Sequence, residues 1–203
     1  MVSKTREKLI EVARQLFVHK GIENTTMNDI ATASDKGRRT IYTYFKNKRE
    51  IYDAVIERES DQLIQRLRHI KEQADLDTTS KLERYLRVRF DFLTETKPRH
   101  EVLLQWIGRD VRRIDRIRRL ALDKELDMFK ALLAQGVDEG VFDPEQAKCL
   151  PALEWLVLQG LWAEDISGRL ESHGLTAETL RDNIIKFIIS GIRINSASEA
   201  SRD

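Results

Sequence analysis

Residues 38–44 read Arg-Arg-Thr-Ile-Tyr-Thr-Tyr, a short helical stretch in which one aliphatic residue stands among cationic, hydroxyl and aromatic ones. The four residues before it, Ser34-Asp35-Lys36-Gly37, are typical of a tight turn, because Asp and Gly both tolerate turn dihedral angles. Thr26, three residues before Asp29, forms a variant of the capping box and starts a helix of about seven residues. Two short helices joined by such a turn predict a helix-turn-helix at about residues 26–45.

Helical periodicity continues on both sides of this motif. Apolar residues recur at helical spacing from about residue 3 to 20, where Lys20-Gly21 provides a C-terminal cation and a helix-ending glycine. Asn47 can cap a fourth helix that extends to about residue 73. Beyond a polar linker, with Pro98 expected to break one helix, we predict further helices at 79–95, 100–107, 110–137, 144–170 and 176–194.

These elements predict an all-α protein: an N-terminal three-helix DNA-binding domain, then a larger helical domain. We place the DNA-binding domain at residues 1–50, the second domain at 51–195 and a flexible tail at 196–203.

Charge is unevenly distributed along the chain. Residues 1–50 hold eleven Lys or Arg against six Asp or Glu, whereas the remaining residues hold 24 basic and 28 acidic ones. Residues 36–49 contain six basic residues and no acidic one, interleaved with aromatics, which favours nucleic acid as the partner of this end. A charge run of this kind is also compatible with a merely solvated face.

The candidate DNA contacts are chosen by chemistry. Arg38 and Arg39 can offer paired donors to guanine, and the threonine methyl of Thr43 can lie against thymine. Tyrosine hydroxyls and lysine ammonium groups suit phosphate oxygens. We expect DNA contacts from these residues: Thr26, Arg38, Arg39, Thr40, Tyr42, Thr43, Tyr44, Lys46 and Lys48. Ile41 and Phe45 are expected to hold the helix on its domain instead, and one of Tyr42 and Tyr44 to be mainly a packing residue, because they cannot share one helix face.

Residues 3 to about 60 resemble the N-terminal domain of the TetR/AcrR family of one-component regulators. The matching positions combine apolar, aromatic and lysine residues at the family's spacing: Leu16-Phe17, Lys20-Gly21, Thr25-Thr26, Asp29-Ile30-Ala31, residues 40–48 and Glu50-Ile51-Tyr52. The resemblance implies a homodimeric regulator that binds a near-palindromic double-stranded operator and responds to a small-molecule effector.

The turn departs from the family's pattern. Ser34-Asp35-Lys36 stands where the family often has Ala-Gly-Val, and Asp35 can adopt a left-handed turn conformation at modest cost. Gly37 stands where Ser or Thr often caps the recognition helix, and Arg39 fills a position that is often small. These differences leave the operator sequence unpredicted.

The second domain supports dimerisation better than it identifies an effector. Residues 150–162 and 184–192 are apolar nearly all round, so a helix there needs partners on several sides. The resemblance implies that the helices at about 144–170 and 176–194 form a four-helix bundle between two protomers. The alternative is that both lie in the core of a monomer.

An effector pocket is the least specific expectation. We name as candidates Phe90, Trp106, Arg109, Arg113, Phe129 and Trp162. The run at 109–119, with six arginines and two aspartates, can bind an anionic effector or form a solvated face of helical ion pairs. Scattered histidines and the single Cys149 give no metal-ligand spacing, and we expect no metal or cofactor.

The competing functions are an enzyme and a protein-binding adaptor. We find no phosphate-binding glycine loop, His-Glu-x-x-His motif or nucleophile elbow, so we expect no enzyme. The basic segment at 36–49 argues against an adaptor that never binds DNA. The sequence has no apolar run of the ~18 residues that a membrane span needs, and its start lacks the apolar core of a signal peptide. We expect a cytoplasmic repressor. Activation stays an alternative, because the sequence does not show where the operator lies relative to a promoter.

Overall fold

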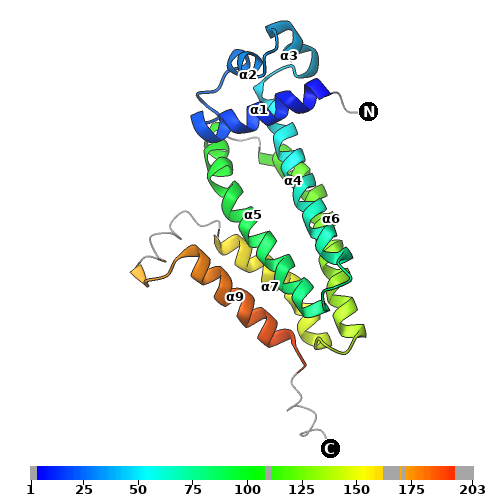
Figure 1. The fold of residues 1–203 in the computed structure, drawn as a ribbon. Helices are drawn as coiled ribbons and strands as arrows, with labels where there is room; N and C mark the ends of the chain where they lie inside the picture. Colours follow the sequence, from blue (N-terminus) through cyan, green and yellow to red (C-terminus); the bar gives the residue numbers. More distant parts are fainter. Residues whose placement is uncertain (1–3, 108–110, 162–169, 171, 195–203) are drawn as a thin grey trace, which may run out of the picture. The chain divides into compact units, whose positions relative to one another are not determined.

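The computed structural model describes the backbone of residues 4–107, 111–161, 170 and 172–194, and the side chains of residues 4–96, 123–154, 156–157, 170 and 172–194. Its named elements are all helices, which confirms the all-α prediction (Figure 1). They are α1 (Lys4–Lys20), α2 (Met27–Ala33), α3 (Arg38–Tyr44), α4 (Lys48–Glu72), α5 (Thr78–Ile107), α6 (Val111–Asp138), α7 (Pro144–Leu161) and α9 (Ala177–Ile192).

One predicted helix boundary is wrong. We expected Pro98 to separate two helices, but α5 runs without interruption from Thr78 to Ile107. A proline inside a helix removes one backbone hydrogen bond and usually introduces a bend. A helix of 30 residues can keep its remaining hydrogen bonds, and its apolar face is buried at Leu82, Leu86 and Leu93 before the proline. The predicted tail at 196–203 lies outside the described residues.

The chain divides into two compact units, one comprising Met1–Gln62 with Thr96–Leu122 and the other Leu63–Glu95 with Asp123–Asp203. In the first unit, α1, α2, α3 and the start of α4 share one hydrophobic core. Leu9, Ile30, Ile41 and Ile51 are fully buried, one from each of these helices. Arg58 of α4 adds a polar clamp, because its Nη1 lies 3.3 Å from Glu11 Oε2 of α1. The part of α4 up to Arg58 therefore packs with the N-terminal helices, whereas the domain boundary at residue 50 stays a prediction.

In the second unit, a separate core joins the end of α4 to α5, α6, α7 and α9. Its aromatic centre consists of Tyr85, Phe90, Phe129 and Phe142, all buried, and the rings of Tyr85 and Phe129 stack with centroids 4.9 Å apart. Thr176 caps α9 by accepting a hydrogen bond from the Thr179 backbone N–H at 3.1 Å. The end of α4 and the helices α5, α6, α7 and α9 therefore bury apolar side chains in one common core.

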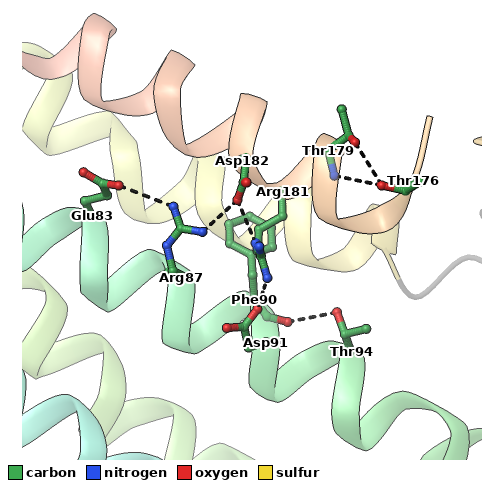
Figure 2. A network of polar contacts seen from close by, with 9 residues as sticks. All are labelled: Glu83, Arg87, Phe90, Asp91, Thr94, Thr176, Thr179, Arg181 and Asp182. Carbon is green, nitrogen blue, oxygen red and sulfur yellow. Dashed lines mark hydrogen bonds and ion pairs between the residues drawn. The ribbon is translucent and has the colours of Figure 1, made fainter. Parts of the chain in front are cut away.

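A polar network on the surface fixes the register between α5 and α9 (Figure 2). Arg87 Nη1 of α5 donates to Asp182 Oδ1 of α9 at 2.8 Å, and Arg181 Nη1 of α9 donates to Asp91 Oδ1 of α5 at 2.5 Å. Arg181 Nε also donates to Asp182 at 2.9 Å, and Glu83 pairs with Arg87 from one turn away. Each exposed pair adds little stability, but the crossed arrangement sets which face of α9 meets α5.

The turn between α6 and α7 is attached to the end of α9. Phe142 forms an isolated antiparallel bridge with Arg193. Asp143 N–H donates to Ile192 O at 2.8 Å, and Ile194 N–H donates to Val141 O at 3.1 Å. Because these bonds come directly after α9, they hold its C-terminal end against the α6–α7 turn.

Candidate nucleic-acid interface

The start of α2 is fixed by the capping box that the sequence predicts. Thr26 Oγ1 accepts a hydrogen bond from Asp29 N–H at 3.1 Å, and Asp29 Oδ2 accepts one from Thr26 N–H at 2.9 Å. Lys20 Nζ, at the end of α1, donates to the same carboxylate at 2.8 Å. Lys20 and the Thr26 bonds lower the pKa of Asp29 to about 2. The carboxylate therefore stays ionised near neutral pH and joins the end of α1 to the start of α2.

The turn between α2 and α3 adopts the conformation expected from its unusual sequence. Asp35 has a φ of +54°, the left-handed value for which the family often uses glycine. The buried Ser34 hydroxyl donates to Ala31 O at 2.9 Å, and Lys36 N–H donates to the same carbonyl at 2.9 Å. Gly37 precedes α3 without a side-chain cap bond, as the sequence predicts. The chain therefore turns from α2 into α3 with Asp35, and not a glycine, at the left-handed position.

The faces of α3 separate packing from exposure. Ile41 is fully buried, and Phe45, directly after the helix, is nearly so. Arg38 and Tyr42 are exposed one turn apart, and the Arg38 guanidinium carbon lies 5.9 Å from the Tyr42 ring centroid. Stacking of a cation on an aromatic face restricts both side chains. The helix thus presents a preformed cation–aromatic pair to solvent.

A second exposed pair lies beside the first. Arg39 and Thr43 are both exposed, and Thr43 Oγ1 donates to Arg39 O at 3.0 Å. This bond uses the hydroxyl hydrogen and leaves the oxygen's lone pairs and the methyl group for a partner. Thr40 is half-buried at the edge of the same surface.

The two tyrosines differ in environment, which decides the choice left open by their spacing. Tyr42 is 44% exposed, whereas Tyr44 is half-buried and packs against the core of the first unit. Tyr52 is buried in the same core, with its ring centroid 5.9 Å from that of Phe17. Of the predicted phosphate contacts, Tyr42 therefore has the more accessible ring and Tyr44 the stronger packing role.

The loop after α3 positions the start of α4. Asn47 Oδ1 accepts from Glu50 N–H at 3.0 Å, which confirms Asn47 as the cap, and Glu50 Oε2 accepts from Lys46 N–H at 2.8 Å. The Lys46 side chain is exposed. Lys48 Nζ donates to Ile22 O at 2.5 Å and to Glu23 O at 3.2 Å. Partial burial lowers the pKa of Lys48.

The sequence did not predict this bracing role of Lys48. The partners lie 26 and 25 residues earlier in the chain, and no local pattern connects them. The cation–aromatic contact of Arg6 with Phe45, at 5.3 Å from guanidinium carbon to ring centroid, was missed for the same reason. Both contacts attach the segment after α3 to earlier parts of the unit.

Replacing Lys48 by methionine is therefore expected to destabilise the protein, because the carbonyls of Ile22 and Glu23 lose a charged donor. Hydrogen bonds to charged groups contribute on the order of 1.5–3 kcal/mol when shielded, and partial exposure of Lys48 should bring the loss to about 1 kcal/mol. Urea unfolding followed by circular dichroism measures it. Lys46→Met, at an exposed lysine of the same loop, is the control, and equal stability of the two variants would contradict the bracing role.

Residues 9–55 match the family described as bacterial regulatory proteins, tetR family, and the match covers α2, the turn, α3 and the capped start of α4. The chain is a TetR-family transcriptional regulator. A curated HTH-type transcriptional regulator of Staphylococcus aureus (strain MRSA252) is 27% identical over 197 residues, which cover 95% of this chain and 96% of the relative.

Solved structures show the same fold along nearly the whole TetR-family chain. A TetR/AcrR-family regulator from Thermobifida fusca covers 93% of this chain and 98% of its own, with a TM-score of 0.70 at 19% identity. A regulator from Saccharomonospora viridis in complex with choline covers 96% of this chain and 100% of its own, with a TM-score of 0.73 at 21% identity. The chain is thus a DNA-binding regulator rather than an enzyme, as the sequence predicted.

The candidate effector residues are only partly described. Phe90 and Phe129 are buried in the core of the second unit. Trp106, Arg109, Arg113 and Trp162 lie outside the residues whose side chains the structure describes, as does the arginine-rich run at 109–119. The predicted pocket stays a prediction. Within the described residues, no helix is long and apolar enough to cross a membrane, and no group of His, Cys, Asp and Glu could hold a metal ion.

Proposed function

We propose that this TetR-family regulator is a cytoplasmic homodimeric repressor that binds a near-palindromic operator and is released by a small-molecule effector. The observation that carries the proposal is the geometry of α3: Ile41 anchors one face in the core, and Arg38, Arg39, Tyr42 and Thr43 are exposed on the others. A recognition helix needs this division, because its reading side chains must reach the groove without giving up the packing that orients it.

The candidate residues fall into two groups, those that contact base edges and those that contact the DNA backbone. In the proposal, Arg38, Arg39 and Thr43 read base edges in the major groove. Tyr42, Tyr44 and Lys46 contact phosphates. Lys48 also lies near a DNA phosphate, while its ammonium group holds the carbonyls of Ile22 and Glu23. The Thr26 hydroxyl caps α2, the helix that precedes the recognition helix α3. In the proposal, Thr26 also contacts the DNA backbone.

Arginine substitutions on α3 test this assignment. Arg38→Ala and Arg39→Ala are expected to reduce operator affinity by about 1–3 kcal/mol each and to relax base preference at one position of each half-site. Arg68→Ala, at an exposed arginine of α4 in the second unit, is the matched control. Footprinting on genomic fragments, followed by fluorescence anisotropy on the operator found, measures both effects.

The same experiment separates the competing functions. Saturable, sequence-specific protection supports an operator-binding regulator. Weak binding without sequence preference, unchanged in the Arg38 and Arg39 variants, would support the protein-binding adaptor instead. Placement of the operator over or upstream of a promoter distinguishes repression from activation.

Dimerisation is proposed through α7 and α9, which pack against each other (Figure 1). Apolar side chains remain exposed on both helices: Leu153 is 49% exposed, Leu156 60% and Phe187 79%. Large apolar side chains that stay exposed on two neighbouring helices favour an interaction site at these helices. A two-fold arrangement would bury the same patch on both protomers and place two α3 helices on one operator.

Release by an effector is proposed on thermodynamic grounds. An effector lowers operator affinity only by the ratio of its affinities for the DNA-bound and free conformations. Residues 48–62 of α4 belong to the first unit and residues 63–72 to the second, so α4 is the natural element through which an effector acts. The Saccharomonospora viridis neighbour was solved in complex with choline, which supports a small molecule as the class of effector.

A further inference from the structure

Three charged side chains from three different helices meet in the interior of the second unit. Arg89 comes from α5, Glu125 from α6 and Glu154 from α7, and each is at most 8% exposed. Arg89 Nε contacts Glu125 Oε1 as an ion pair, whereas Glu154 Oε1 lies 4.0 Å from the same nitrogen. Within the described part of the chain, Glu154 Oε1 is a buried oxygen without a hydrogen-bond partner.

The charges of this cluster do not balance. One guanidinium faces two carboxylates, so full ionisation leaves one buried negative charge, which is costly to keep away from water. Arg89 is already engaged by Glu125, and its contact with Glu154 is at the limit of an ion pair. An anion entering the cluster would increase the imbalance, whereas a monovalent cation would cancel it.

Aromatic rings lie one helical turn from the ion pair. Tyr85 precedes Arg89 by four residues on α5, and Phe129 follows Glu125 by four residues on α6, so each lies on the same helix face as its charged neighbour. Their rings stack on each other, and the Tyr85 hydroxyl donates to Glu125 O at 3.1 Å. Carboxylates beside aromatic faces are the surroundings that stabilise organic ammonium groups.

From this arrangement we infer that the Arg89–Glu125–Glu154 cluster binds an organic cation, with Glu154 as its counter-charge. The inference rests on the proposed function, because it gives the chemical class of the effector. Pro151, one turn before Glu154 in α7, has no backbone N–H to donate to the preceding turn. This turn of α7 therefore has one backbone hydrogen bond fewer, next to the carboxylate that the cation needs.

Binding to the full-length protein tests the inference directly. The probes are four monovalent cations (choline, tetraethylammonium, benzyltrimethylammonium and ethidium), the uncharged choline isostere dimethylbutanol, and decanoate as an anion. We expect isothermal titration to detect at least one of the cations, with dimethylbutanol and decanoate much weaker. Glu154→Gln should weaken that cation at least about tenfold, whereas Glu145→Gln, at an exposed position of α7, should leave it unchanged.

Protein without ligand provides a second readout. Burial raises the pKa of Glu154 to about 7, and that of Glu125 also rises, with Arg89 opposing both shifts. A carboxyl whose pKa is higher in the folded than in the unfolded protein lowers stability as pH rises from the unfolded to the folded value. The melting temperature of Glu154→Gln should therefore exceed that of the unmodified protein increasingly between about pH 4.5 and pH 7. Cation binding should strengthen as pH rises over this interval, because Glu154 loses its proton and gains the negative charge that the cation needs.

The outcomes separate this inference from the proposed function. Absence of binding by all four cations up to millimolar concentration, equal binding by Glu154→Gln, or preference for decanoate would overturn the cation site. Specific protection of an operator in the same preparation would then still support the regulator. Loss of specific DNA binding with an intact, Glu154-dependent cation site would overturn the regulatory proposal and leave the site standing.

Discussion

Phe187→Asp is expected to convert the proposed dimer to a monomer and to abolish tight operator binding. Phe187 is 79% exposed on α9, so in an isolated protomer its ring faces water. Burying a phenylalanine contributes about 1.5–3 kcal/mol, and a two-fold interface contains the change twice. The dimer dissociation constant should rise by at least about a hundredfold.

Light scattering coupled to size exclusion measures this transition, and anisotropy on the operator measures its consequence. A monomer holds one recognition helix and can read only one half-site, so operator affinity should fall together with dimer content. Phe187→Leu keeps an apolar side chain and should remain dimeric. A dimeric mass for the aspartate variant would place the interface elsewhere, and a monomeric mass for the unmodified protein would contradict the proposed dimer.

Gly136→Ala is expected to cause the largest loss of stability among Gly→Ala replacements at the described glycines. A Cβ built on Gly136 would lie 2.0 Å from Phe142 Cδ2 and 2.3 Å from Cε2, and that ring is fully buried. Gly136 O also accepts from Val141 N–H at 2.9 Å and Phe142 N–H at 3.0 Å, so the backbone cannot move away without loss of these bonds. Overpacking of this kind costs about 1–3 kcal/mol, after which helix propensity returns at most ~1 kcal/mol.

Gly191→Ala is the matched control, since a Cβ there has no neighbour within 4 Å and α9 continues through it. It should leave stability unchanged or raise it slightly. Urea unfolding followed by circular dichroism compares the two variants. Adding Phe142→Leu to Gly136→Ala should recover part of the loss, because a smaller side chain relieves the clash. Additive losses in the double variant would show that the steric explanation is wrong.

The helix-turn-helix was predictable because its signals are local. The Thr26–Asp29 capping box, the Asn47 cap and the turn at Asp35 involve residues no more than a few positions apart, and the structure has each of them. Buried and exposed positions on α3 also follow from periodicity, which correctly placed Ile41 in the core. Spacing could not decide which tyrosine packs, because that depends on what lies beneath the helix.

The features that were not predictable join distant parts of the chain. Lys48 meets carbonyls more than 20 residues earlier, and Arg89 meets Glu125 and Glu154 from other helices. A sequence shows that these side chains can ionise but not which of them meet. Continuity of α5 through Pro98 was missed because the local preference of proline is weaker than the packing of a long helix. The candidate effector site therefore depends on contacts between helices that are distant in sequence, and sequence patterns do not reveal such contacts.

The separation of faces on α3 has a consequence for protein engineering. Stability of the N-terminal unit depends on Ile41 and Phe45, while Arg38, Arg39 and Thr43 contribute little to its core. A library randomised at these three exposed positions should therefore consist mostly of folded members, and selection on altered promoters could act on specificity alone. New operator preferences could then be reached by single exchanges without compensating changes in the scaffold.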